Sequence, residues 1–140
     1  CCPGMDYCAL ATARSIPISQ KISHSFNNFD QQKNIGDLKI KISGCINACG
    51  HHHVGNIGIL GLDKNGEESY QITLGGSATE NASIGEIVGP SFPESKLMDA
   101  LKTILKTYEK NRISEDEDFL KVFNRIGISE FKKDLYDNSQ

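Results

Sequence analysis

The sequence lacks the features that mark membrane, secreted or nucleic-acid-binding proteins. It has no apolar run of about eighteen residues, so no segment is predicted to cross a bilayer. Its 15 basic and 18 acidic residues give a net charge of −3, without a basic tail or stripe, which argues against a nucleic-acid partner. No charged segment followed by an apolar one opens the chain, so no secretory signal is visible and we expect a cytoplasmic protein.

The cysteines also lack the pattern of a disulfide framework. There are 5 of them, an odd number, and all lie between Cys1 and Cys49. Disulfide-stapled proteins more often carry an even set spread along a small secreted chain. Clustered cysteines without a secretory signal instead favour reduced thiolates and a metal. The chain opens on Cys1 without an initiator methionine, and we interpret it as a fragment of a longer protein.

The N-terminal half is predicted to hold a broken helix and one strand. Residues 8–25 have a short helical pattern, interrupted around Pro17 because proline disfavours helix in the residue before it. Residues 26–36 are polar and are predicted to form a surface loop. Residues 38–42 alternate apolar and charged side chains, the period of a half-buried strand that runs into the cysteines at 45 and 49.

The middle of the chain is predicted to form a hairpin. Apolar residues 54–62 and alternating residues 70–74 flank Asn65-Gly66, and an Asn-Gly pair between apolar runs is a strong hairpin signal. A further short strand is predicted over residues 86–88. Together these patterns predict an α+β fold with a small, mostly antiparallel sheet packed by helices.

The rest of the chain is predicted to be helical. Ser91 with Glu94, and Ser114 with Glu117, resemble capping boxes that open helices. Apolar residues at helical spacing follow each box, which indicates core packing. Gly127 is predicted to stop the second helix, and Ser129 to cap a last one. We expect one domain over residues 1–140, in which residues 113–140 form a helical tail.

Two cysteine pairs carry the chemistry of the sequence. Cys2 and Cys8 form C-x5-C, and Cys45 and Cys49 form C-x3-C. Four thiolates suit a [4Fe–4S] cluster, because each iron needs one soft anionic ligand besides its sulfides. A structural zinc site is the alternative, although zinc knuckles usually use C-x2-C or C-x4-C spacing. A third interpretation treats the cysteines as small buried hydrophobes.

The residues around these cysteines resemble a known family. Residues 2–11 read CPGMDYCALA and residues 44–50 read GCINACG. Both are similar to the cluster motifs of the siroheme-dependent sulfite and nitrite reductases, except that Ile46 stands where many members carry proline. The resemblance continues through five later segments, at residues 58–61, 74–77, 87–90, 125–128 and 131–132.

The resemblance implies a fold, a set of cofactors and a reaction. The fold would be the C-terminal siroheme/[4Fe–4S] domain of these reductases. Cys2, Cys8, Cys45 and Cys49 would ligate a [4Fe–4S] cluster, and Cys49 would also bridge to the siroheme iron. Six electrons from a ferredoxin or flavoprotein would take sulfite to sulfide, or nitrite to ammonia, with the protein orienting the cofactors.

Four further residues are candidates for siroheme binding. His51 and His52 follow the last cysteine and could meet the carboxylates of siroheme, although independent metal chelation and a solvated loop remain alternatives. Asn47 lies inside the C-x3-C turn, where asparagine tolerates left-handed backbone, so a structural role competes with a cofactor role. Gly76 could allow a bulky cofactor to approach the backbone closely, or could serve a turn.

No catalytic residue is assigned, because the chain shows no cluster of arginine and lysine suited to hold the sulfite dianion. In the family these basic residues come from the preceding half of a longer chain, the expected partner of this one. We therefore predict that the fragment alone has no reductase activity and holds no siroheme. The alternatives are a stand-alone [4Fe–4S] electron-transfer module and a zinc-stabilised binding domain.

Overall fold

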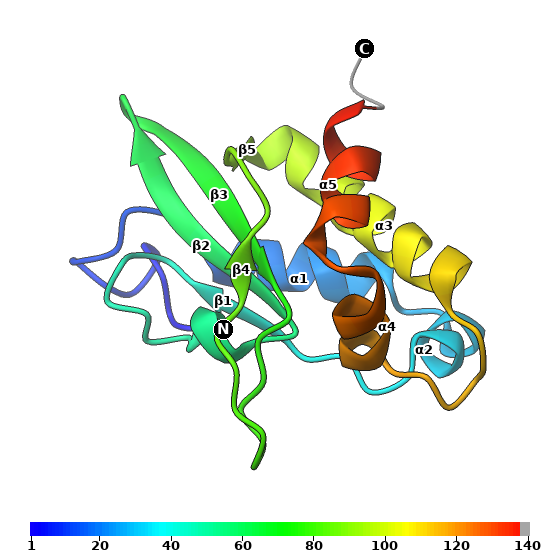
Figure 1. The fold of residues 1–140 in the computed structure, drawn as a ribbon. Coiled ribbons are helices and arrows are strands. Elements are labelled where there is room, and N and C mark those ends of the chain that lie inside the picture. Colours follow the sequence, from blue (N-terminus) through cyan, green and yellow to red (C-terminus); the bar gives the residue numbers. More distant parts are fainter. Residues whose placement is uncertain (138–140) are drawn as a thin grey trace.

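The computed structural model describes residues 1–137, and its centre is a small sheet (Figure 1). The strands are β1 (Ile40–Ser43), β2 (Ile57–Lys64), β3 (Glu67–Leu74), β4 (Glu86–Ile87) and β5 (Phe92–Pro93). They lie in the order β1-β2-β3-β4, and β5 pairs with the other end of β3. Only β1 and β2 run parallel among these pairs. The predicted α+β fold with a mostly antiparallel sheet is therefore confirmed.

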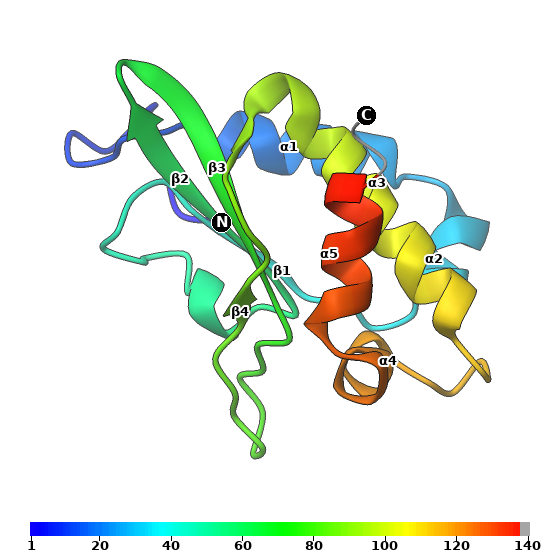
Figure 2. The same ribbon diagram turned by 45° about the horizontal axis from the view of Figure 1, so that its top comes forward.

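Helices pack against one side of this sheet. They are α1 (Ile16–Ser25), α2 (Phe29–Ile35), α3 (Glu94–Asn111), α4 (Phe119–Ile126) and α5 (Ile128–Tyr136), with a short 3-10 helix η1 (His52–Val54). Figures 1 and 2 show α3, α4 and α5 together on one side, and the cysteine-bearing segments on the side away from them. The sheet thus separates a helical core from the loops that carry the cysteines.

The core is built from the helical faces that the spacing predicts. In α3, Leu97, Leu101 and Ile104 are buried in the same hydrophobic core as the sheet residues Ile59 and Ile72. Burying one such side chain contributes about 1.5–3 kcal/mol, so this face alone explains why α3 docks. A second aromatic contact set joins the last three helices, and it consists of Tyr108, Phe119, Phe123 and Phe131.

The predicted hairpin is confirmed. Lys64 pairs with Glu67, which leaves Asn65-Gly66 as a two-residue turn between β2 and β3. Both turn residues have positive φ, 56° and 87°, as the twist of antiparallel strands requires. Strand β2 starts at Ile57, because the first residues of the predicted segment 54–62 belong to η1 and the turn after it.

Two predictions in the N-terminal half were wrong. Residues 8–15 are not helical, and α1 instead begins at Ile16 with Pro17 in its first turn. Proline is tolerated there because first-turn amides have no partner within the helix. The predicted loop over residues 26–36 contains α2, whose N-terminus is capped by the Asn28 side chain accepting a hydrogen bond from the amide of Asp30.

The predicted capping boxes were also wrong. Pro93 precedes α3, and Ser91 lies further back, where its hydroxyl accepts a hydrogen bond from Ser69. The cap of α4 is Asp118 rather than Ser114. Ser129 lies inside α5, whereas Gly127 does end α4, as predicted, with φ of 76°. Of these three helices, only α4 has an N-cap whose side chain accepts a hydrogen bond from the first turn.

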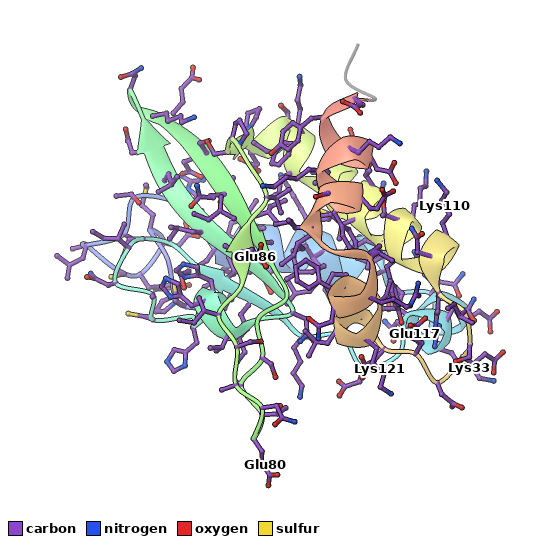
Figure 3. All side chains as sticks on the ribbon, viewed as in Figure 1. Lys33, Glu80, Glu86, Lys110, Glu117 and Lys121 are labelled. Atoms are coloured by element: carbon purple, nitrogen blue, oxygen red, sulfur yellow. The ribbon has the colours of Figure 1, made fainter. Side chains whose placement is uncertain are left out.

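The segment between β3 and β4 extends away from the body of the protein. Figure 3 shows Glu80 at its tip, and an antiparallel bridge between Ser77 and Ser83 closes its base. The helical tail predicted over 113–140 contains α4 and α5, and its residues 138–140 lie outside the described part of the chain. Among residues 1–137, no helix combines the length and apolar character needed to cross a membrane.

Candidate metal centre

The two cysteine pairs meet in space. Cys2 and Cys8 lie in the coil before α1, and Cys45 and Cys49 lie in the loop between β1 and η1. All four line one cavity of about 100 Å³. Both ribbon views show these two loops side by side (Figures 1 and 2). The rest of the cavity wall consists of Pro3, Gly4, Leu10, Ala11, Gly44 and Asn47.

Backbone hydrogen bonds join the two loops. The amide of Cys2 donates to the carbonyl oxygen of Ile42 over 3.0 Å. The carbonyl oxygen of Gly44 accepts from the amides of Thr12 and Ala13, each over 3.0 Å, and from the Thr12 hydroxyl over 3.1 Å. The relative placement of the two cysteine pairs therefore depends on main-chain contacts at residues next to the cysteines.

Cys2 is one of the two buried cysteines. Its thiol is buried and accepts a hydrogen bond from the amide of Gly44 over 3.1 Å. Burial by itself would raise the pKa of this thiol, but hydrogen bonds from Ser15 and from the amides of Gly44 and Gly4 outweigh it, and the net pKa lies below the ordinary value. A thiol whose anion is stabilised in this way suits a metal ligand.

The second loop is a tight turn with one open cysteine. Cys45 is buried, whereas Cys49 is exposed. The residue with left-handed backbone is Ala48, with φ of 57°. The expectation that Asn47 would adopt this geometry was therefore wrong, and Asn47 instead lines the cysteine cavity. Gly50 is required by packing, because a Cβ atom there would lie 1.8 Å from the carbonyl oxygen of Ile42.

The three histidines after Cys49 occupy different environments. His51 and His53 are exposed, and His51 has left-handed backbone with φ of 56°. His52 is 2% exposed, and its Nδ1 lies 2.9 Å from the Ser43 hydroxyl. Burial, together with the neighbouring His53, lowers the pKa of His52 from 6.5 to about 4. His52 is therefore a neutral side chain of the protein interior.

Gly76 lies beside the histidine turn. A Cβ atom at Gly76 would stand 2.5 Å from the carbonyl oxygen of Gly55 and 2.6 Å from that of His53. Its own carbonyl oxygen accepts a hydrogen bond from the Asn56 side chain. The cavity walls include Asn47 but not His51, His52 or Gly76. The sequence-predicted residues thus fall into a cysteine cavity and a neighbouring histidine turn.

The donor set fits a cluster better than a single ion. All five cysteines are free thiols. Within residues 1–137, no three His, Cys, Asp or Glu side chains converge closely enough to hold one metal ion, whereas zinc needs its sulfurs at about 2.3 Å. The four thiols line a shared cavity of about 100 Å³, roughly the volume that three water molecules occupy in the liquid. A [4Fe–4S] cluster, which takes one thiolate on each iron, suits this wider arrangement.

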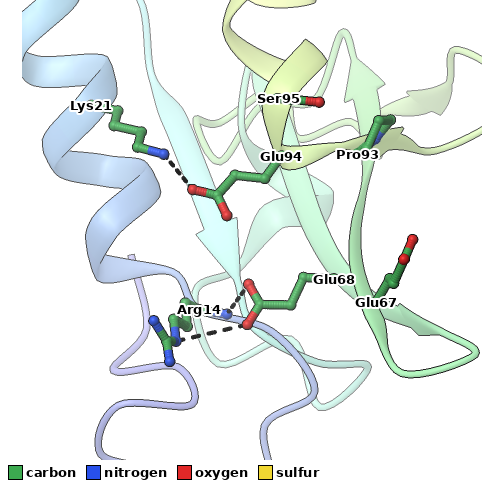
Figure 4. Close-up of a pocket in the computed structure, with 7 residues that line it drawn as sticks. All are labelled: Arg14, Lys21, Glu67, Glu68, Pro93, Glu94 and Ser95. Carbon is green, nitrogen blue, oxygen red and sulfur yellow. Dashed lines mark hydrogen bonds and ion pairs between the residues drawn. The ribbon is translucent and has the colours of Figure 1, made fainter.

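A larger hollow of about 580 Å³ lies elsewhere and has no cysteine in its wall (Figure 4). Each of its two cations lies beside a carboxylate: Lys21 pairs with Glu94, and Arg14 lies 3.8 Å from Glu68. The Tyr70 hydroxyl donates to the Glu68 carboxylate over 2.7 Å. Because each cation already faces a carboxylate, this hollow offers no excess of positive charge for an anionic substrate.

Sequence analysis missed two buried serines next to the cysteine loops, Ser15 and Ser43. Ser15 donates a hydrogen bond to the carbonyl oxygen of Cys2, and Ser43 accepts one from the amide of Gly50. Ser43 immediately precedes the Gly44-Cys45 motif, which is a signal that could have drawn attention to it. Ser15 carried no such signal, because it fell inside the helical pattern predicted over residues 8–25.

Comparison with known proteins gives a consistent result. The sulfite reductase [NADPH] hemoprotein beta-component of Bacillus velezensis is 27% identical over 129 residues, which is 91% of this chain and 22% of that protein. The assimilatory ferredoxin-dependent nitrite reductase of Haloferax mediterranei is 26% identical over 116 residues, 79% of this chain and 20% of that protein. The chain therefore spans about a fifth of the length of these relatives.

Solved structures show the same fold. The NirA protein of Mycobacterium tuberculosis matches with a TM-score of 0.74 and 23% identity, covering 93% of this chain and 25% of that one. Dissimilatory sulfite reductase I matches with a TM-score of 0.77 and 11% identity, covering 96% of this chain and 50% of that one. A family model described as the nitrite and sulphite reductase 4Fe-4S domain matches residues 1–139. The chain belongs to the nitrite and sulphite reductase 4Fe-4S domain family.

Proposed function

We propose that this chain is the cluster-binding part of an assimilatory sulfite or nitrite reductase. The reaction would be the six-electron reduction of sulfite to sulfide, or of nitrite to ammonia, at siroheme coupled to a [4Fe–4S] cluster. The observation that carries the proposal is the single cavity lined by all four motif cysteines, in a chain of this family. Relatives of both kinds are similar to it, so the proposal names both substrates.

In this proposal Cys2, Cys8, Cys45 and Cys49 ligate the cluster. Their exposure suggests a division of roles, because Cys2 and Cys45 are buried whereas Cys49 is exposed. An exposed thiolate at the rim can be shared with a second iron, so we assign Cys49 as the bridge to siroheme. When bound, the coupled cofactors would supply the one-electron transfers of the reaction.

The side chains of this chain would then bind and shield the cofactors. The Gly44 amide, which donates to the sulfur of Cys2, offsets part of the negative charge of the bound cluster. Leu10 and Ile46 are exposed apolar side chains beside Cys8 and Cys45. An apolar rim of this kind excludes water from the site when the rest of the reductase covers it.

The histidine turn contributes in two ways. The exposed His51 is our candidate for binding a siroheme carboxylate, because its ring is open to solvent. The buried ring of His52 faces Ser43, so we assign it to positioning the turn that follows Cys49. Asn47 would contact the cofactor from the cavity wall, and Gly76 would keep the histidine turn close to β3.

The remaining partners lie outside this chain. The chain spans about a fifth of its relatives, and we propose that the missing N-terminal half supplies the basic residues that hold sulfite or nitrite. A ferredoxin or flavoprotein would donate the electrons in the cytoplasm. Residues 1–140 would form one domain, since sheet and helices share a hydrophobic core, and would be inactive when isolated from the rest of the reductase.

The absorption spectrum of the full-length protein, with its iron and acid-labile sulfide content, tests this proposal. The expected result is iron and sulfide together with the intense bands of siroheme. Iron and sulfide without siroheme bands would favour a stand-alone electron-transfer module. Zinc without sulfide would favour a zinc-stabilised binding domain. Either of these last two results would overturn the proposal.

A further inference from the structure

Ser15 occupies a capping position without capping a helix. It precedes α1, where a serine hydroxyl ordinarily accepts a hydrogen bond from an amide of the first turn. The Ser15 hydroxyl makes no such bond, although its side chain is fully buried. Instead Oγ donates to the carbonyl oxygen of Cys2 over 2.6 Å. The hydroxyl therefore belongs to the cysteine loop rather than to the helix.

The same hydroxyl also contacts the sulfur. Ser15 Oγ lies 3.6 Å from Cys2 Sγ, within hydrogen-bond reach for a sulfur atom. In the free thiol, the S–H group can donate to Oγ while the hydroxyl proton goes to the carbonyl oxygen. A sulfur that ligates iron has no proton and can only accept. The hydroxyl then faces two acceptors, the carbonyl oxygen at 2.6 Å and the sulfur at 3.6 Å, and shares its one proton between them in a three-centre hydrogen bond.

The protein holds Ser15 in this place from two sides. A Cβ atom at Gly4 would lie 2.3 Å from Ser15 Oγ, so only glycine at position 4 leaves room for the hydroxyl. On the other side, the carbonyl oxygen of the preceding residue, Arg14, accepts a hydrogen bond from the Tyr70 hydroxyl over 3.1 Å. The Arg14 amide also donates to the Glu68 carboxylate (Figure 4). These contacts anchor the backbone that carries Ser15 to β3.

We propose that Ser15 is a positioning residue that holds Cys2 and raises the reduction potential of the bound cluster; this inference rests on the proposed function. Reduction adds negative charge to a cluster, and hydrogen bonds to its ligand sulfurs stabilise that charge. The Gly44 amide supplies one such bond to Cys2 over 3.1 Å. The Ser15 hydroxyl supplies a second one, from a side chain and therefore open to substitution.

The test is a redox titration of the full-length protein with its cofactors bound, followed by electron paramagnetic resonance of the cluster. We expect Ser15→Ala to shift the midpoint potential of the cluster to a more negative value and to speed iron loss to a chelator. Ser69→Ala is the matched control, because Ser69 is equally a buried serine but its hydroxyl contacts Ser91 and the carbonyl oxygen of Phe92. The control should leave the potential unchanged.

The outcomes separate this inference from the proposed function. A wild-type protein without iron and acid-labile sulfide would end both. Two results would end this inference alone, provided the wild type binds its cluster. One is a Ser15→Ala variant with the midpoint potential of the wild type, and the other is a Ser69→Ala variant with the same shift as Ser15→Ala. If Ser15→Ala binds no cluster, Ser15→Thr, which keeps the hydroxyl, must bind one for the inference to stand.

Discussion

The imidazole Nδ1 of His52 lies 2.9 Å from the hydroxyl oxygen of Ser43. The same oxygen accepts a hydrogen bond from the amide of Gly50 over 3.1 Å. Which of Ser43 Oγ and His52 Nδ1 donates the proton in this contact depends on the imidazole tautomer. A neutral histidine thus holds the serine that fixes the turn after Cys49.

This pair predicts a pH-dependent stability. The pKa of His52 is lowered to about 4 by burial and by His53, from 6.5. Between these values the unfolded chain binds a proton that the folded protein does not, so the free energy of unfolding falls as the pH falls. We expect a loss of about 1–2 kcal/mol between about pH 7 and about pH 5. Urea unfolding of wild type and His52→Gln measures it, and an equal loss in both proteins would contradict the prediction.

Adjacent cysteines are predicted to differ in iron binding. Cys2 lines the cavity shared with three other thiols, whereas Cys1 is exposed and lies outside it. In the full-length protein, Cys2→Ser should strongly reduce iron and acid-labile sulfide, because serine is a poor ligand for iron in such clusters. Cys1→Ser should leave both at wild-type level. Equal iron content in the two variants would remove Cys2 from the ligand set.

Gly50 is predicted to tolerate no side chain. Gly50→Ala would bring a Cβ atom within 1.8 Å of the Ile42 carbonyl oxygen, so the turn after Cys49 must shift, at a cost of about 1–3 kcal/mol or more. Gly66→Asn is the comparison, because nothing lies within 4 Å of a Cβ there and its only strain is that of a φ of 87°, which asparagine tolerates better than most residues. Denaturant unfolding compares them. If Gly50→Ala were as stable as Gly66→Asn, the close contact would be in error.

The cap of α4 gives a further test. Asp118 accepts a hydrogen bond from the amide of Lys121 over 2.9 Å, and losing such a cap costs about 1 kcal/mol. Asp118→Ala should therefore lower the unfolding free energy by about that amount. Ser114→Ala should change the unfolding free energy little, because Ser114 accepts hydrogen bonds from Glu117 and Arg112 through its main-chain carbonyl oxygen, which alanine keeps. A larger loss from Ser114→Ala would restore the capping box that the sequence pattern suggested.

Sequence reasoning succeeded where a local pattern determines the structure. The Asn65-Gly66 turn needs positive φ at both residues, and only a few residue types supply it. The apolar face of α3 recurs at helical spacing, so burial follows directly from the pattern. The two cysteine spacings are local patterns suited to a metal cluster, and they pointed to the four cysteines that line the cavity.

It failed where the deciding contact is distant or where two local signals compete. Helix α2 is stabilised by the Asn28 cap and the buried Ile35, and a polar composition obscured both. The left-handed residue of the cysteine turn is Ala48, which has no special tolerance for that backbone. The hydrogen bond from the Ser15 hydroxyl to Cys2 joins residues 13 positions apart, and no local pattern around Ser15 indicates it.

The hairpin of β2 and β3 and the cysteine cavity differ in the length of chain that each must close. Lys64 and Glu67 meet across two residues, whereas the bond from Gly44 to Cys2 joins residues separated by 42 positions. Closing the shorter loop costs less chain entropy and occurs sooner. The folding chain should therefore complete its central hairpin before it brings its sulfur atoms together, so a newly made molecule becomes able to bind iron only after β2 and β3 have paired.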